Sequence, residues 1–139
     1  MPRTAVLAGV TILLVDDHDE SRDVLRTWLE SAGARVLEAG DGEYALGVVA
    51  TLVPAVIISD LRLPKLDGLT LARMIRAHAQ VARIKLIAVT GVESAEARAA
   101  AREAGFDEYL PRPVDGEALI KLVNRLVLSG ASTPRAPSR

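Results

Sequence analysis

The stretch Thr11-Ile12-Leu13-Leu14-Val15-Asp16-Asp17 joins an unbroken apolar run to two adjacent acids. Such short, β-branched and aliphatic runs are typical of strands that are buried on both faces of a parallel sheet. Two more runs of this kind occupy residues 55–59 and 85–89, and weaker ones occupy residues 35–38 and 107–110. The sequence therefore predicts five strands, three of which are fully buried.

Longer segments with the apolar period of a helix separate and follow these runs. The fourth of them is rich in alanine. The inward-facing residues expected for the other four are Val24, Leu25, Trp28 and Leu29; Tyr44, Ala45, Val48, Val49 and Leu52; Leu69, Leu71, Ala72 and Ile75; and Leu119, Ile120, Val123, Leu126 and Val127. Helix N-caps are predicted at Asp41, Ser94 and Asp115, and helix ends at Gly33 and Gly105.

The predicted order is strand and then helix, five times in succession. Strict alternation favours right-handed crossovers and a parallel sheet with helices on both faces. We therefore expect an α/β fold, a doubly wound (βα)5 three-layer sandwich over residues 10–128. Residues 1–9 would form an N-terminal arm, and residues 129–139, which are rich in Ser, Pro, Ala and Arg, a flexible C-terminal tail or linker.

Composition limits what the chain can be. Its 139 residues, half of them apolar, suffice for one domain and are too few for two ordinary ones. A net charge of −1 and only four aromatic residues disfavour direct nucleic-acid binding. The absence of cysteine excludes disulfides, thiolate metal sites and a thiol nucleophile, and it agrees with a reducing cytosol.

The apolar run that follows Arg3 could imitate a secretory signal, but it ends in acids where a cleavage site needs small neutral residues. No segment of the sequence has the length of a membrane span. We therefore expect a cytoplasmic protein that does not contact the membrane.

Polar residues follow several of the predicted strands. In an open α/β sheet the ligand site lies outside the carboxyl ends of the strands, where Asp16, Asp17, Asp60, Thr90 and Arg112 would meet. Three carboxylates packed together repel one another, and such a cluster usually persists because a cation neutralises it. Carboxylate oxygens without His or Cys suit a hard ion such as Mg²⁺.

Each of these residues also has a simpler explanation. The acid pair could only favour a helix N-terminus, Asp60 could be a loop residue, Thr90-Gly91 a turn, and Arg112-Pro113 a solvated bend. Taken singly, these explanations are preferred. Taken together they are weak, because five polar groups would have to fall by chance at one edge of the sheet.

The histidines and the large aromatic residues are assigned no role in this site. His18 and His78 lack ligand spacing and are expected to be solvated. Trp28, Tyr44 and Tyr109 are mostly candidates for the core.

Four segments give the chain a specific resemblance: Ile12–Asp17, Ile57–Gly68, Leu86–Gly91 and Ala104–Pro113. They contain an acid pair, an Asp with Pro at the fourth position after it and Asp-Gly beyond, a strand-end Thr and a terminal basic-Pro pair. From about Val10 to Leu128 the sequence resembles the CheY-like receiver domains of two-component response regulators. Its Gly-Phe-Asp-x-Tyr-Leu ending resembles receivers attached to hybrid histidine kinases.

This resemblance implies a flavodoxin-like fold with strand order 2-1-3-4-5. It also implies that Asp60 is the phosphoacceptor, and that Mg²⁺ is held by Asp16, Asp17, Asp60 and the backbone carbonyl of Arg62. Thr90 would hydrogen-bond the phosphoryl oxygens. The chain would be a phosphoprotein of a phosphorelay rather than an enzyme, with self-phosphorylation and autodephosphorylation only.

The resemblance also implies a mechanism and partners. Tyr109 matches the aromatic residue that turns inward when Thr90 is drawn toward the phosphate. The phosphoryl donor would be a sensor histidine kinase or a histidine phosphotransfer domain, and the output would pass to a downstream protein whose identity the sequence does not give. A homodimer through the face of the fourth and fifth helices is one arrangement that the resemblance allows.

Arg112 departs from the family, which normally has Lys at this position. A guanidinium near Asp60 could pair with that carboxylate in a fork. No nearby residue in the sequence obviously replaces the lysine, although Lys65 lies on the loop after Asp60. The bond between Arg112 and Pro113 is expected to be cis, as in the family.

Two alternatives to a phosphorylation-dependent switch remain at this point. Arg112 motivates the first, a receiver-like interaction module that is independent of phosphorylation. The second is an aspartyl-phosphate hydrolase, but such an enzyme usually needs a second acid two residues after the nucleophile, where this chain has Arg62.

Overall fold

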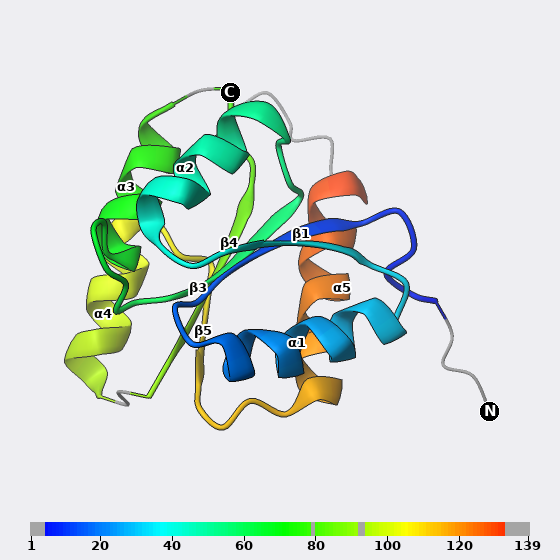
Figure 1. Cartoon of the computed structure of the whole chain (residues 1–139). Coiled ribbons are helices and arrows are strands. Elements are labelled where there is room, and N and C mark those ends of the chain that lie inside the picture. Colours follow the sequence, from blue (N-terminus) through cyan, green and yellow to red (C-terminus); the bar gives the residue numbers. More distant parts are fainter. Residues whose placement is uncertain (1–4, 79, 92–93, 133–139) are drawn as a thin grey trace.

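The computed structural model describes residues 5–78, 80–91 and 94–132, and these form five strands and five helices in alternation (Figure 1). The strands are β1 (Thr11–Val15), β2 (Arg35–Ala39), β3 (Val56–Asp60), β4 (Lys85–Thr90) and β5 (Glu108–Pro111). The helices are α1 (Asp19–Ser31), α2 (Gly42–Thr51), α3 (Gly68–Ala77), α4 (Ala95–Ala104) and α5 (Gly116–Ser132). The predicted order of elements is confirmed, with strand ends that differ by one residue at most.

All five strands are parallel, and their order across the sheet is β2-β1-β3-β4-β5. Helices α1 and α5 cover one face of the sheet, and α2, α3 and α4 cover the other (Figure 1). The sequence prediction of a flavodoxin-like three-layer fold is therefore confirmed. β3 is the central strand, so its last residue, Asp60, lies in the middle of the carboxyl edge.

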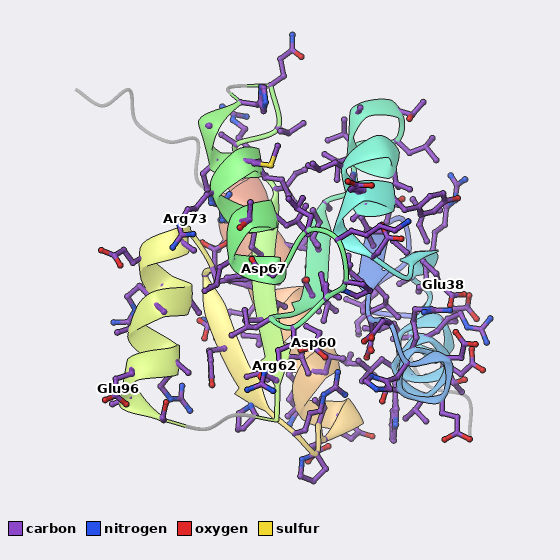
Figure 2. All side chains as sticks on the ribbon, turned by 60° about the vertical axis from the view of Figure 1, so that its left-hand side comes forward. Glu38, Asp60, Arg62, Asp67, Arg73 and Glu96 are labelled. Atoms are coloured by element: carbon purple, nitrogen blue, oxygen red, sulfur yellow. The ribbon has the colours of Figure 1, made fainter. Side chains whose placement is uncertain are left out.

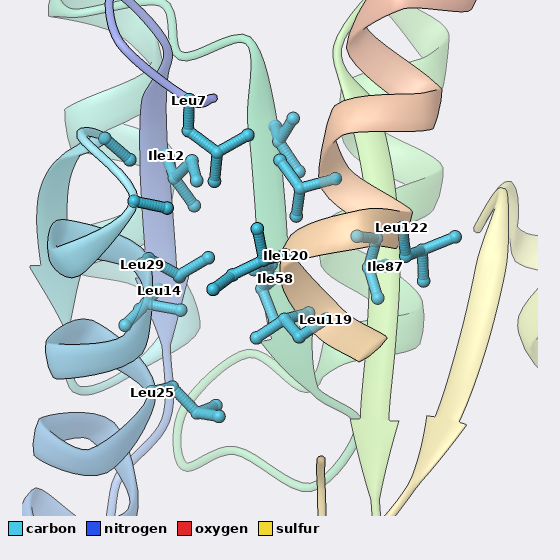
Figure 3. Close-up of a cluster of buried hydrophobic side chains, with 14 of the residues drawn as sticks. Leu7, Ile12, Leu14, Leu25, Leu29, Ile58, Ile87, Leu119, Ile120 and Leu122 are labelled. Carbon is cyan, nitrogen blue, oxygen red and sulfur yellow. The ribbon is translucent and has the colours of Figure 1, made fainter. Parts of the chain in front are cut away.

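Each face of the sheet has its own hydrophobic core, because successive side chains of a strand point to opposite faces. Ile12 and Leu14 of β1 pack toward α1 and α5, whereas Leu13 and Val15 pack toward the other layer. Figure 3 shows the first of these cores. Since both faces are covered, the central strands have no need for polar residues until they reach the edge.

Three residues predicted to face inward are exposed. Val24 is 57% exposed, Tyr44 61% and Leu52 47%. Val24 and Tyr44 each precede an inward-facing residue, and a rotation of about 100° per residue carries them onto the solvent side. Leu52 lies after the last residue of α2. The predicted apolar faces were thus too wide by about one residue.

The predicted helix boundaries are confirmed. Asp41 and Ser94 each accept a hydrogen bond from the backbone N–H three residues later. Asp115 accepts from the backbone at the beginning of α5. Gly105 ends α4 with a φ of +118°, and Gly33 follows α1 with a φ of +99°. Both angles belong to a region that favours glycine.

Ordered structure extends beyond the expected domain limits on both sides. Leu7, in the predicted arm, is fully buried, and its N–H donates to the carbonyl of Ala32. At the other end α5 continues to Ser132, so the predicted beginning of the tail at Ser129 falls inside a helix. Residues 1–4 and 133–139 lie outside the described residues. The domain limits of 10 and 128 remain a prediction.

One arginine connects several segments at the amino end of β4. Arg76 of α3 donates to the carbonyls of Gly105, Ala82 and Ile84 at 2.9, 2.7 and 2.6 Å. Its Nη2 also lies 2.8 Å from Asp107 Oδ2, which accepts in addition from a backbone N–H of β4. The Arg76 network, as we call these contacts, joins α3, β4 and the entrance to β5.

Candidate functional site

Three acids meet at the carboxyl edge of the sheet. Asp16 follows β1, Asp60 ends β3, and Asp17 lies beside Asp16 on the loop. One ligand atom from each of these acids and one from His18 all lie within 4.8 Å of one another. Asp16 is the most enclosed of the acids, with a side chain that is 4% exposed, against 12% for Asp60 and 36% for Asp17.

His18 belongs to this cluster, which the sequence analysis missed. Its side chain is 72% exposed, as expected, but its Nδ1 lies 3.2 Å from Asp17 Oδ1 and 3.5 Å from Asp16 Oδ1. Its backbone N–H donates to Asp16 Oδ1 at 2.9 Å. The only sequence signal is its position directly after the acid pair. His78, the other histidine, lies at the end of α3 and is not part of the cluster.

Arg112 reaches the acids from the segment after β5. Its Nη2 lies 2.8 Å from Asp16 Oδ2 and 3.5 Å from Asp60 Oδ2. The expected two-pronged fork on Asp60 is therefore wrong: a single nitrogen bridges two acids, and the shorter contact is to Asp16. The Arg112–Pro113 bond is cis, as expected.

Thr90 and Tyr109 lie on the neighbouring strands. Thr90 ends β4 and is 2% exposed, and its carbonyl accepts from the backbone N–H of Arg112 at 2.9 Å. Tyr109 of β5 is 9% exposed, in agreement with its assignment to the core. The guanidinium of Arg98 on α4 lies 4.7 Å from the centre of the Tyr109 ring. This cation–π contact connects β5 to α4.

The loop after β3 carries two basic residues, Arg62 and Lys65. Arg62 is exposed and lies close to Asp60 at the end of the sheet (Figure 2), where its backbone N–H donates to Asp60 Oδ1 at 3.1 Å. Lys65 points elsewhere, since its Nζ lies 3.8 Å from Asp41 Oδ2. This contact gives no sign that Lys65 replaces the lysine that the family normally has at the position of Arg112.

Arg22 of α1 contacts the backbone of the site, a role that the sequence analysis did not predict. Its Nη1 donates to the backbone carbonyl of Asp16, its Nε to Glu38 of β2 at 2.8 Å, and its Nη2 to Asp19 at 2.8 Å. The hydrogen bond to Glu38 is the main cause that raises the pKa of the Arg22 guanidinium above its ordinary value. Through these contacts Arg22 fixes the backbone that carries Asp16.

Gly68 allows α3 to begin against the end of β3. A Cβ at this position would lie 2.4 Å from the carbonyl oxygen of Asp60 and 2.9 Å from Leu61 Cα. Both of these atoms belong to the backbone and cannot turn away as a side chain could. Close packing of α3 on β3 thus requires glycine here, and it fixes the backbone of Asp60.

Gly68→Ala is therefore expected to lower the free energy of unfolding by about 2 kcal/mol or more, although alanine is the better helix former. The matched control is Gly47→Ala in α2, where an added Cβ meets nothing within 4 Å. That variant should gain about 0.5–1 kcal/mol. Urea unfolding of both variants measures the difference, and equal effects would show that the close approach at Gly68 can relax.

The donor set fits a hard divalent cation. Three carboxylates within reach of one another supply oxygen ligands and negative charge, which are what Mg²⁺ prefers in proteins. Asp60 is partly exposed at the edge, so its carboxylate is open to an electrophile. A carboxylate beside a cation site is an arrangement that can accept a phosphoryl group.

Comparison with known proteins shows the family to which this chain belongs. The family model described as the response regulator receiver domain matches residues 12–124. An uncharacterized 14.6 kDa protein from the sodA1 3′ region of Leptolyngbya boryana is 37% identical over 123 residues, which is 88% of this chain and 94% of that protein. Among the described residues, no helix has both the length and the apolar character needed to cross a membrane.

Response regulator MprA of Mycolicibacterium vanbaalenii is 35% identical over 118 residues, or 85% of this chain, which spans about half the length of MprA. The receiver domain of sensor histidine kinase PA1611 from Pseudomonas aeruginosa PAO1, solved with a magnesium ion coordinated in its active-site cleft, is 33% identical with a TM-score of 0.80. The alignment covers 86% of this chain and 98% of that one. The chain belongs to the family of response regulator receiver domains.

Proposed function

We propose that this receiver domain takes a phosphoryl group onto Asp60 from the phosphohistidine of a histidine kinase or of a phosphotransfer domain. The observation that carries this proposal is the meeting of Asp16, Asp17 and Asp60 within 4.8 Å at the edge of the sheet, with Arg112 beside them. The receiver domain of PA1611, which has magnesium in its cleft, supports a magnesium ion in the equivalent role here.

In the proposed transfer, a carboxylate oxygen of Asp60 forms a bond to phosphorus as the bond between phosphorus and the donor imidazole nitrogen breaks. Asp16, Asp17, Asp60 and the backbone carbonyl of Arg62 would hold Mg²⁺, which supplies positive charge against the phosphoryl oxygens. The hydroxyl of Thr90 would donate a hydrogen bond to one of these oxygens.

The proposed output is a change of partner binding. Phosphorylation replaces the single negative charge of the Asp60 carboxylate with a phosphoryl group that carries close to two, and such a charge can favour a different packing of the neighbouring loops. Thr90 and Tyr109 would carry the change, and the contact of Tyr109 with Arg98 gives it a route to α4. We propose that the face of α4 and α5 meets the downstream protein or a second copy of the chain.

Intact-mass measurement tests this function. The chain is incubated with Mg²⁺ and a small acyl phosphate, and it is expected to gain the mass of one phosphoryl group. The same incubation with a chelator in place of Mg²⁺ should leave the mass unchanged. An unchanged mass with Mg²⁺ present would contradict the proposal.

A second candidate function, an interaction module that is independent of phosphorylation, is favoured by one observation. Arg112 already bridges Asp60, the proposed phosphoacceptor, and Asp16, a proposed metal ligand. This alternative expects no gain of mass under the same conditions. Turnover on a foreign substrate is not proposed, because Arg62 stands where an aspartyl-phosphate hydrolase would need its second acid.

A further inference from the structure

Both oxygens of Asp16 already accept a hydrogen bond. Oδ1 accepts from the backbone N–H of His18 at 2.9 Å, and Oδ2 accepts from Arg112 Nη2 at 2.8 Å. Because the Asp16 side chain is 4% exposed, water competes poorly for these positions. The Asp16–Arg112 ion pair is accordingly less screened than a surface pair.

Arg112 contacts an acid that follows a strand distant from its own in the sheet. It follows β5, whereas Asp16 follows β1, and the strand order places β4 and β3 between them. With neighbouring strands about 4.8 Å apart, a contact between these two positions favours a long side chain on the segment after β5. The ammonium of a lysine ends one bond earlier. We therefore expect a lysine at this position to pair less well with Asp16.

We propose that Arg112 competes with the divalent cation for Asp16, and so sets the Mg²⁺ concentration at which the site becomes ready for phosphorylation. This inference rests on the proposed function and adds a regulator to that same site. A guanidinium and a cation on one carboxylate oxygen repel each other, so a metal ion that uses Asp16 Oδ2 must first displace Arg112. Asp60 Oδ2, 3.5 Å from the same nitrogen, would be released in the same step.

The size of the effect follows from the fraction of molecules in which Arg112 has left Asp16. The apparent dissociation constant for the metal equals the intrinsic constant divided by that fraction. A pair that is formed about 90% of the time would weaken apparent metal binding about tenfold. Removal of the guanidinium should therefore strengthen metal binding by a factor that is easily measured.

Titration calorimetry with Mg²⁺ provides the test, on the wild type and three variants. Arg112→Gln should bind Mg²⁺ about tenfold more tightly than the wild type, and Arg112→Lys about threefold more tightly, because lysine keeps the charge but has the shorter reach. The matched control is Lys65→Gln, which removes a positive charge from the same edge of the sheet. Lys65 pairs with Asp41 and not with the acids of the site, so this variant should change the affinity less than about twofold.

Equal affinities in Arg112→Gln and the wild type would overturn the proposal. So would an increase in Lys65→Gln as large as that in Arg112→Gln, because the effect would then be one of net charge rather than of a specific pair.

Thermal unfolding separates competition from a merely structural role. In a chelator, Arg112→Gln should melt below the wild type, since Asp16 loses its partner. In saturating Mg²⁺ this difference should disappear or reverse. A residue that only supports the fold would lower the melting temperature equally in both conditions, and that result would overturn the proposal.

The outcome also distinguishes this inference from the proposed function. If the wild type is phosphorylated and Arg112→Gln binds Mg²⁺ no more tightly, the competition is refuted and the proposed function stands. If the metal affinities shift as expected but Asp60 gains no phosphoryl group, the competition stands and the proposed function fails. If no variant binds Mg²⁺, both are refuted.

Discussion

Asp60→Asn is expected to abolish the gain of one phosphoryl group completely. The amide that replaces the carboxylate is a poor nucleophile, and the substitution also removes one of the three acids of the cluster. Asp60 is the acid at the end of the central strand, where the site is open to a donor. Intact mass after incubation with Mg²⁺ and an acyl phosphate is the measurement.

The control for Asp60→Asn is Glu96→Gln. Glu96 is an exposed acid at the beginning of α4 (Figure 2), and this variant should be phosphorylated as the wild type is. Thermal unfolding confirms that both variants are folded. A gain of mass in folded Asp60→Asn would show that another carboxylate is the nucleophile.

Asp17→Asn is expected to weaken Mg²⁺ binding by at least about tenfold, or about 1.4 kcal/mol, since it deletes a ligand together with the charge that holds the ion. The side chain of Asp17 is 36% exposed, and Asp17 is a member of neither hydrophobic core, so the fold should not suffer. Titration calorimetry measures the affinity.

Glu20→Gln serves as the comparison for Asp17→Asn. It removes an equal charge three residues away, from an exposed acid outside the cluster. Its affinity for Mg²⁺ should stay within about twofold of the wild type, as expected for a screened surface charge. Unchanged affinity in Asp17→Asn would remove Asp17 from the ligand set.

The fold could be predicted almost completely from the sequence because its signals are local. Continuous apolar runs such as Thr11–Val15 mark buried strands, and single residues such as Asp41, Ser94 and Gly105 mark helix ends. Once the strands are placed, topology brings Asp16 and Asp60 to one edge without further information. The convergence of the acids follows from strand order, and strand order was available from the resemblance.

Side-chain direction could not be predicted in the same way. The acid that Arg112 contacts depends on the length of its side chain across three strands, and the contact of Arg22 with the carbonyl of Asp16 depends on how α1 lies on the sheet. The exposure of Val24 and Tyr44 depends likewise on the rotation of each helix about its axis. These quantities are set by packing between elements, and a one-dimensional pattern does not contain them.

Because of the Arg76 network, the two ends of the sheet are held by different kinds of contact. At the amino end of β4, Arg76 and Asp107 tie a helix, a strand and a loop together through five hydrogen bonds. At the opposite end the backbone N–H of Arg112 donates to the carbonyl of Thr90, and Arg112 Nη2 contacts Asp16 and Asp60. The two ends of β4 and β5 are thus held by different chemistry, the amino ends by hydrogen bonds to backbone groups and the carboxyl ends in part by acids whose charge a cation or a phosphoryl group would change. A change of charge at the acids therefore acts on the carboxyl ends of these strands, whereas the Arg76 network holds their amino ends by contacts that do not depend on that charge.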